Sequence, residues 1–332
     1  MKQQKVIQKQ INSIVKDIPK IRAHSFTPVD KRFLHLGDKL NFNLYIPNKH
    51  TQMSLFLQSN TVIDKQYNEK LQKIEQLFTS MLEKTKYDDF LEINIQNILD
   101  DKLLTLEEKT NIIYETSGEL TNSLYSNPSA LKNAKLSKNI VSPILQSILY
   151  NEHTISSYIQ IIKYDYYTHT HSLNVSIYAL CLGAELNLSK DRLIKLGRSA
   201  LLHDLGKSKI ESNIVNKVDS LTDHEYAHMK KHSSFGYDIA KEIGIVDKEI
   251  LDGILHHHEK LNGTGYPEGL KNEEIKLFPR IIAICDVFDA MTTKRSYKNA
   301  LSSFEALSVI KAEMQTHLDK NILNAFIKML HT

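Results

Sequence analysis

Helical periodicity runs through most of the chain and limits its fold more than any other feature. From about Asp64 onward, apolar residues recur three and four positions apart, which is the pattern of helices with one buried face. Within residues 65–84, this face is formed by Tyr67, Leu71, Ile74, Leu77, Phe78 and Leu82. The sequence shows neither an alternation of strands with helices nor an internal repeat, so we expect an all-α domain.

Breaks in the periodicity mark where individual helices begin and end. Asn127-Pro128-Ser129 interrupts the chain, and Ser142-Pro143 has the composition of a helix start. Helices are expected near residues 142–164, 168–187, 190–203, 222–243, 247–258, 275–292 and 303–315.

The N-terminal part of the chain has a different pattern. Its first twenty residues alternate Lys and Gln with Ile and Val and predict a short amphipathic helix. Between Phe26 and about Val62, the runs FTPVDKRFL, LNFNLYI and MSLFLQSN are short, β-prone and separated by turn residues. We therefore expect a small β-containing module at residues 1–85 and an all-α domain at residues 86–332. The alternative is a decorated N-terminal arm on a single domain.

Composition excludes several classes of protein. Forty-two basic against thirty-nine acidic residues leave a net charge of +3, too small to indicate nucleic-acid binding. No apolar run is long enough to span a bilayer, and MKQQKVIQKQ lacks the apolar core of a secretion signal. Cys181 and Cys285 are the two cysteines, which excludes a disulfide framework and a zinc site built from cysteines. We expect a cytoplasmic protein of ordinary globular composition.

Histidines are concentrated in one third of the chain. Ten of the fifteen lie between His153 and His258, and imidazole is a common metal ligand. His203-Asp204 ends an apolar helical run, where Gly206 lets the chain turn. His257 and His258 point about 100° apart on a helix, so both reach one centre only at a helix end. Two metals, one for each histidine, make that arrangement easier.

Three further residues complete the set of candidate ligands. His171 and His232 each open or interrupt an apolar helix, and Asp286 closes one. His169 lies about 200° round the helix from His171, so only one of the two faces a given centre. His224 and His228 share the helical face of His232 but are more typical of an exposed polar stripe than of ligands.

The donor set favours a pair of metal ions over a single zinc. Five imidazoles and two carboxylates exceed what one tetrahedral zinc needs, and they suit iron or manganese. In a two-metal hydrolytic site, ions about 3.5–4 Å apart hold a bridging hydroxide and polarise the oxygens of the reacting group. Asp204 is placed to bridge such ions. Lys207, Arg295 and Lys298 are placed to bind a phosphate, although exposed helix ends alone also explain Arg295 and Lys298.

The motifs taken together resemble the HD-GYP family of cyclic di-GMP phosphodiesterases, a branch of the HD phosphohydrolase superfamily. The matching segments are HSLNV, LLHDLGK, KKHSSFG, HHEKLNGTGYP and RIIAICDVFDAMTTKRSYK, within a motif core of residues 164–298. The resemblance implies that two divalent ions, iron or manganese, are bound by His171, His203, Asp204, His232, His257, His258 and Asp286. It implies substrate contacts by Lys207, Gly265, Tyr266, Pro267, Arg295 and Lys298, with Asp204 and Lys207 as the catalytic residues. His169, His228 and His256 match no ligand position.

The resemblance also implies an activity and partners. The expected reaction is hydrolysis of cyclic di-GMP to linear pGpG, and diguanylate cyclase (GGDEF) domains are expected partners of the loop formed by Gly265, Tyr266 and Pro267. A homodimer is a further expectation. Two alternatives stay open: a non-catalytic receptor that binds a cyclase or the dinucleotide, and another HD phosphohydrolase that acts on nucleotides. Because all seven ligand positions are present, the enzyme is favoured. The N-terminal stretch is similar to a small β module often found before such domains.

One position departs from part of the family. Some members carry a glutamate one helical turn before the first histidine, where it supports a third metal. This chain has Tyr167 there, and a phenol with a pKa near 10 is a poorer ligand for divalent ions than a carboxylate. We therefore expect two metals per chain, pGpG as the main product, and slow further conversion to GMP.

Overall fold

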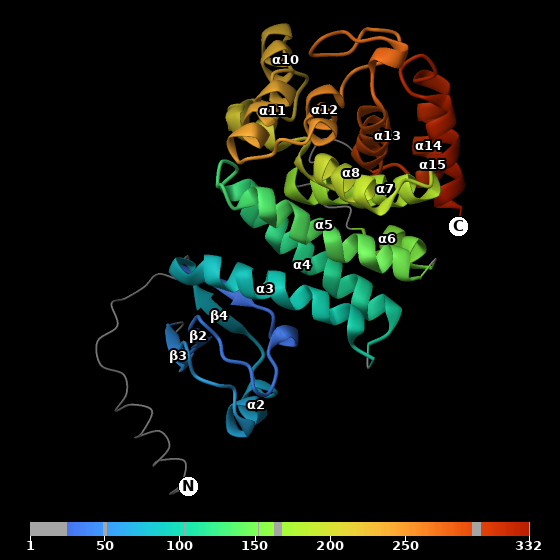
Figure 1. Cartoon of the computed structure of the whole chain (residues 1–332). Coiled ribbons are helices and arrows are strands. Elements are labelled where there is room, and N and C mark those ends of the chain that lie inside the picture. Colours follow the sequence, from blue (N-terminus) through green and yellow to red (C-terminus); the bar gives the residue numbers. More distant parts are fainter. Residues whose placement is uncertain are drawn as a thin grey trace, which may run out of the picture. The chain divides into compact units, whose positions relative to one another are not determined.

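The computed structural model describes residues 25–48, 52–102, 104–151, 153–162, 168–293 and 300–331. The chain divides into two compact units, Met1–Asn94 and Ile95–Thr332, and the division falls within helix α3 (Lys84–Asp100) (Figure 1). The expected boundary between residues 85 and 86 stays a prediction. The amphipathic helix expected for the first twenty residues lies outside the described part of the chain.

The first unit contains a small antiparallel sheet, as the sequence predicted. Its strands are β1 (Phe26–Val29), β2 (Leu44–Pro47), β3 (Met53–Leu57) and β4 (Leu77–Ser80), in the order β1-β4-β2-β3. Helix α2 (Lys65–Leu71) precedes β4 along the chain. Phe33, Phe42, Leu44 and Tyr87 of α3 are fully buried, and the rings of Phe42 and Tyr87 lie 5.5 Å apart. The Tyr87 hydroxyl oxygen accepts a hydrogen bond from the backbone N–H of Asp30 at 2.8 Å.

The continuous helix expected over residues 65–84 is wrong in its second half. Helix α2 ends at Leu71, and residues 77–80 form the central strand β4, which pairs with both β1 and β2. Leu77 and Thr79 are buried while Phe78 and Ser80 are half-buried, which is the alternation of a strand. Leu82, placed on the expected helical face, is almost fully exposed. Pairing with two distant strands overrides the local helical pattern here.

The second unit is all-α, which confirms the predicted fold class. Its helices are α4 (Leu106–Ser126), α5 (Asn133–Tyr150), α6 (Thr154–Ile161), α7 (Thr168–Glu185), α8 (Lys190–Leu202), α9 (Ser212–Val215), α10 (Asp223–Met229), α11 (His232–Glu242), α12 (Lys248–His256), α13 (Leu277–Thr292), α14 (Ser303–Glu313) and α15 (Lys320–Leu330), with the 3-10 turns η4 (Leu205–Lys209) and η5 (Asn272–Glu274).

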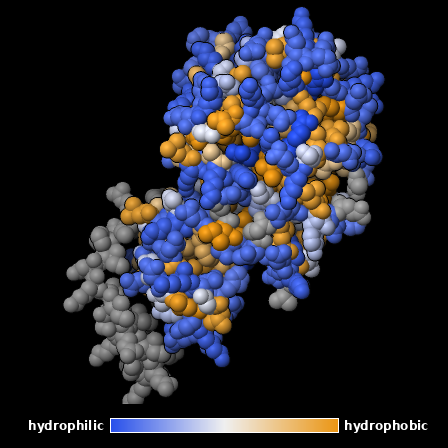
Figure 2. All heavy atoms as spheres, in the orientation of Figure 1, coloured by the Kyte–Doolittle hydropathy of each residue, from blue (hydrophilic) through white to orange (hydrophobic). Residues whose placement is uncertain are grey.

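Helix α7 is the centre of this unit. Its side chains are buried from His171 to Gly183, as expected of a helix covered on all sides. Helices α4, α8, α13 and α15 pack against it (Figure 1). On the face seen in Figure 2, the surface of the unit is mostly hydrophilic with small separate apolar patches. Among the described residues, no helix combines the length and the apolar character that crossing a bilayer requires.

Two expected helix boundaries are wrong. Pro143 lies inside α5, which begins ten residues earlier at Asn133, so Ser142-Pro143 is not a helix start. The Asn133 side chain donates to the backbone carbonyls of Asn127 and Pro128 and so fixes the turn before the helix. The expected helix at residues 222–243 is two helices, α10 and α11, and the break between them places His232 at the first position of α11.

A close approach between η4 and α11 depends on Gly206. A Cβ atom at this position would lie 1.9 Å from the carbonyl oxygen of His232 and 2.4 Å from the amide nitrogen of Gly236. Both atoms belong to the backbone, so no side-chain rotation relieves the clash. Gly206 therefore allows the turn after Asp204 to lie directly against the start of α11.

We expect Gly206→Ala to lower the free energy of unfolding by about 1–3 kcal/mol, because the backbones of η4 and α11 must separate. Gly118→Ala is the matched control: the nearest atom to its new methyl group is Leu173 Cδ2 at 3.9 Å, and alanine stabilises a helix interior by about 1 kcal/mol relative to glycine. Urea unfolding of the full chain, followed by circular dichroism, measures both. Equal midpoints for Gly206→Ala and the wild type would contradict the argument.

Candidate metal centre

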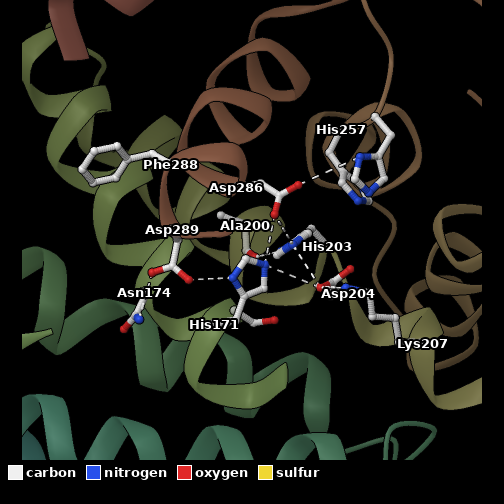
Figure 3. A network of polar contacts seen from close by, with 12 residues as sticks. His171, Asn174, Ala200, His203, Asp204, Lys207, His257, Asp286, Phe288 and Asp289 are labelled. Carbon is white, nitrogen blue, oxygen red and sulfur yellow. Dashed lines mark hydrogen bonds and ion pairs between the residues drawn. The ribbon is translucent and has the colours of Figure 1, made fainter. Parts of the chain in front are cut away.

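Ends and starts of different helices bring all seven predicted metal ligands together. His171 lies in the first turn of α7, His203 and Asp204 follow α8, His232 opens α11, His257 and His258 follow α12, and Asp286 lies on α13. Their donor atoms form three groups within 4.8 Å: His171 with His203 and Asp286, His203 with Asp204 and His257, and His232 with His257 and His258. Figure 3 shows most of these side chains pointing toward one another.

Backbone carbonyls orient three of the imidazoles. The Nδ1 atoms of His203, His232 and His257 lie 2.7, 2.8 and 2.8 Å from the carbonyl oxygens of Ala200, Met229 and Ile254, each three residues earlier. A carbonyl only accepts, so each Nδ1 carries the hydrogen and donates it. Each Nε2 is consequently left with a lone pair that faces the cluster. This is how protein imidazoles are commonly prepared for a metal ion.

His171 is oriented by a carboxylate instead. Its Nδ1 donates to Asp289 Oδ2 at 2.7 Å, and Asn174 Nδ2 donates to Asp289 Oδ1 at 3.0 Å. The hydroxyl of Tyr114 completes the chain by donating to Asn174 Oδ1 at 2.9 Å, and all four side chains are buried. Asp289 is a positioning residue that sequence reasoning missed. The sequence feature that could have pointed to Asp289 is its position three residues after Asp286, on the same face of α13.

The contacts inside the cluster fit a cation. The Nε2 atoms of His232 and His257 lie 3.2 Å apart although both carry lone pairs, an arrangement that is repulsive without a cation between them. His203 Nε2 and Asp204 Oδ1 are buried and have no hydrogen-bond partner among the described residues. Burial lowers the pKa values of His203, His232 and His257, so these imidazoles are in the neutral form that metal binding requires.

Asp204 faces both halves of the cluster. Its Oδ2 lies 3.6 Å from His171 Nε2 and 3.5 Å from His203 Nε2, and its Oδ1 lies 3.4 Å from His232 Nε2. Burial opposes ionisation, but the Lys207 ammonium, 2.5 Å from Oδ2, and the surrounding imidazoles hold the pKa of this carboxyl well below its usual value. An ionised carboxylate with one oxygen toward each group of imidazoles suits two cations better than one.

The loop predicted to line the substrate site lies against His258. The ring of Tyr266 is 4.7 Å from the imidazole of His258 and 6.2 Å from that of His232. At Gly265, a Cβ atom would lie 2.5 Å from Glu259 Cα, so the loop passes too close to the end of α12 for any other residue. Arg295, Lys298 and Tyr167 lie outside the described residues, so their predicted roles stay predictions.

Glu259 holds this loop in place, a role that sequence reasoning did not give it. Its carboxylate accepts three hydrogen bonds, from the backbone N–H groups of Glu268, Gly269 and Leu270, at 2.7, 3.0 and 3.0 Å. The side chain is buried, so these bonds are protected from water. The residue after the two histidine ligands thereby links the end of α12 to the segment that follows Pro267.

The histidines set aside by the sequence analysis stay outside the three donor groups. His228 Nε2 lies 3.4 Å from a carboxylate oxygen of Glu211. His256 Nδ1 donates to Asp252 at 2.8 Å, and its Nε2 lies 3.4 Å from Glu268. His169 is half-buried and lines a neighbouring cleft with Lys207. Each therefore has surroundings that do not require a metal ion.

Comparison with known proteins agrees with the fold and the site. The HD domain family matches residues 146–322, more than half of the chain, and the chain belongs to this family. An HDG"Y"P protein from Bdellovibrio bacteriovorus has the same fold, with a TM-score of 0.67 at 20% identity over 92% of this chain and 100% of its own. HD phosphohydrolases use divalent metal ions, and the clustered donors fit such ions.

Several curated relatives match about half of the chain. A cyclic di-GMP phosphodiesterase of Pseudomonas aeruginosa is 35% identical over 57% of this chain and 46% of its own length. A cyclic di-GMP phosphodiesterase of Thermotoga maritima is 33% identical over 50% of this chain and 45% of its own length. A 3′3′-cGAMP-specific phosphodiesterase of Vibrio cholerae is 34% identical over 50% of this chain and 36% of its own length. The chain thus matches less than half the length of each of these relatives.

We expect Asp289→Ala to weaken metal binding about 10–100-fold, because His171 loses the acceptor that fixes its Nδ1–H and its ring orientation. Metal content after dialysis against a graded chelator, measured by mass spectrometry, tests this. Asp252→Ala is the matched control, since it removes a carboxylate from His256 at a similar distance but outside the cluster. Equal metal retention in both variants would show that Asp289 does not position His171.

For Glu259→Ala, we expect the backbone amides of residues 268–270 to exchange their hydrogens about tenfold faster or more, because three N–H groups lose their acceptor. Hydrogen exchange measured by mass spectrometry on the metal-loaded full chain reports this directly. Glu268→Ala serves as the control, because its side chain is 56% exposed and accepts none of these bonds. Unchanged exchange in Glu259→Ala would mean that the loop is ordered by other contacts.

Proposed function

We propose that this protein hydrolyses one 3′–5′ phosphodiester of cyclic di-GMP and releases linear pGpG. The observation that carries the proposal is the buried cluster of seven donors with Lys207 paired to Asp204 at its margin. Several relatives are named cyclic di-GMP phosphodiesterases, which supports the same substrate. Hydrolysis adds water across one P–O3′ bond: the hydroxyl goes to phosphorus and the proton to the departing O3′.

We further propose two iron or manganese ions per chain. The arrangement of Asp204 supports this number, because Oδ2 faces His171 and His203 while Oδ1 faces His232. The donors are imidazoles and carboxylates with no thiolate, which favours iron or manganese over metals that prefer sulfur. When bound, such ions lower the pKa of a coordinated water and polarise the phosphoryl oxygens.

Residues of the chain supply the rest of the chemistry. Lys207 places an ammonium beside the cluster, where it binds a non-bridging phosphate oxygen and stabilises charge that develops during the displacement. In our proposal, Arg295 and Lys298 add to this positive charge. The loop of Gly265, Tyr266 and Pro267 lies on the His258 side and contacts the substrate there. Burial of His171, His203, His232 and His257 keeps bulk water from the ligands.

Partners and location follow from the same proposal. The loop presents Pro267 and Glu268 to solvent, so it is accessible to a diguanylate cyclase (GGDEF) domain, the partner implied by the family resemblance. A homodimer and a cytoplasmic location remain expectations of the sequence. A receptor that binds cyclic di-GMP without cleaving it is the competing function, and turnover separates the two.

Anaerobic purification, metal analysis and identification of the products test the proposal in one preparation. We expect two ions per chain and conversion of cyclic di-GMP to pGpG, with GMP appearing slowly. 3′3′-cGAMP is the comparison substrate, because two relatives are named for it. Binding of cyclic di-GMP by the metal-loaded protein without any turnover would establish the receptor instead.

Variants of two contacting residues separate metal binding from phosphate binding. We expect Asp204→Ala to lose metal and activity together, because it faces both donor groups. Lys207→Ala should keep its metal and lose roughly 10²-fold in kcat/KM, the usual effect of removing one charge-stabilising donor. His228→Ala, a histidine outside the cluster, should match the wild type in both respects. A metal-free but folded Lys207→Ala protein would contradict the role given to this lysine.

A further inference from the structure

A cleft of about 320 Å³ is lined in part by Lys207 and by none of the predicted metal ligands. Its walls come from four elements of the second unit: Asn122 and Tyr125 of α4, His169 of α7, Lys207 of η4, and Asn216 at the end of α9. Lys207 also contacts Asp204 at 2.5 Å. Figure 3 shows this lysine at the margin of the cluster, beyond Asp204. The Lys207 side chain thus contacts both a group bound in the cleft and the predicted metal ligand Asp204.

The described lining of the cleft combines polar and apolar groups and carries little charge. Lys207 is the one Lys, Arg, Asp or Glu side chain among the described residues that line it. The other polar side chains are carboxamides and hydroxyls, with the rings of Tyr125 and His169 beside them. Among these described residues a second phosphate would meet no further cation, whereas an uncharged ring with hydrogen-bonding edges would meet matching groups.

Tyr125 is a fixed wall rather than a mobile surface side chain. Its hydroxyl oxygen lies 2.7 Å from Ser172 Oγ and 2.9 Å from the carbonyl oxygen of Leu201. These bonds anchor the phenol to α7 and α8 and hold its ring in one orientation. A fixed aromatic ring is the kind of surface on which a nucleobase stacks.

We propose that this cleft is a nucleobase subsite, in which Asn122 and Asn216 hydrogen-bond the edge of one base of the cyclic dinucleotide. The inference rests on the proposed function, because it places the scissile phosphate at Lys207 and the metal ligands. Each phosphate of a cyclic dinucleotide joins two nucleosides, so a phosphate at Lys207 brings one of them to the cleft. The Tyr266 loop contacts the cluster through His258 and His232, and so leaves the Lys207 side to this base.

The carboxamides make the subsite selective for the base. An amide presents both a donor and an acceptor, and a guanine edge presents N1–H and N2–H donors beside the O6 acceptor. Adenine offers a different order of donors and acceptors. Asn122 and Asn216 therefore act on the base, while the metal cluster and Lys207 act on the phosphate whatever base it carries.

The test compares cyclic di-GMP with bis(p-nitrophenyl) phosphate, a phosphodiester that has no base. For Asn122→Ala and Asn216→Ala, we expect the ratio of kcat/KM for cyclic di-GMP to kcat/KM for the nitrophenyl ester to fall about tenfold each, mainly through KM, as for the loss of one hydrogen bond. Asn213→Ala is the matched control: Asn213 is an exposed residue of the same short helix α9 and does not line the cleft. Its ratio should equal that of the wild type.

The outcomes distinguish this inference from the proposed function. If the wild type cleaves cyclic di-GMP but neither asparagine variant changes the ratio, the subsite is overturned and the phosphodiesterase stands. If both substrates lose activity equally in these variants, the asparagines serve the metal site and the subsite is again overturned. If the metal-loaded wild type cleaves the nitrophenyl ester but no cyclic dinucleotide, the proposed function fails and the subsite fails with it.

Discussion

The site depends on the Nδ1 hydrogen bonds that four of the five ligand imidazoles make, those of His171, His203, His232 and His257. These bonds fix the tautomer, so that His203, His232 and His257 direct bare Nε2 atoms into the cluster. Two of these atoms lie 3.2 Å apart, and only a cation makes that contact favourable. Because the ends of α8, α10 and α12 meet around these atoms, we expect metal binding to stabilise the helical unit.

Helix ends are suited to this task for a reason that lies in the backbone. The carbonyl groups of a last helical turn lack intrahelical partners, and side chains that donate a hydrogen bond near a helix C-terminus commonly satisfy them. Ala200, Met229 and Ile254 lie in the last turns of α8, α10 and α12, and the imidazoles donate to these carbonyls. The ligand positions and the helix ends are therefore one feature: a histidine just after a helix satisfies a backbone acceptor and presents its other nitrogen to a metal.

The position of these histidines directly after helix ends explains which site residues the sequence could and could not predict. His203-Asp204 and His257-His258 follow apolar helical runs, so their place at helix ends was readable from a few residues. Asp289 could not be paired with His171, because the two residues are 118 positions apart; its place three residues after Asp286 indicates a shared helical face but not a partner. The strand β4 was mistaken for helix for a similar reason, since its pairing with β1 and β2 depends on residues 33 to 54 positions earlier.

Charge in the cluster determines what else the site must bind. Asp204, Asp286 and Asp289 each contribute one formal negative charge to the cluster, and Lys207, which contacts Asp204, contributes one positive charge. These four groups therefore carry a formal net charge of about −2. In a buried site of low dielectric, that charge repels a phosphodiester. In the proposed function, two divalent cations would reverse the sign and leave an excess of positive charge for the phosphate. The acidic residues placed to hold these metals would then make substrate binding dependent on them, and the cleft beside Lys207 would be left to recognise the base.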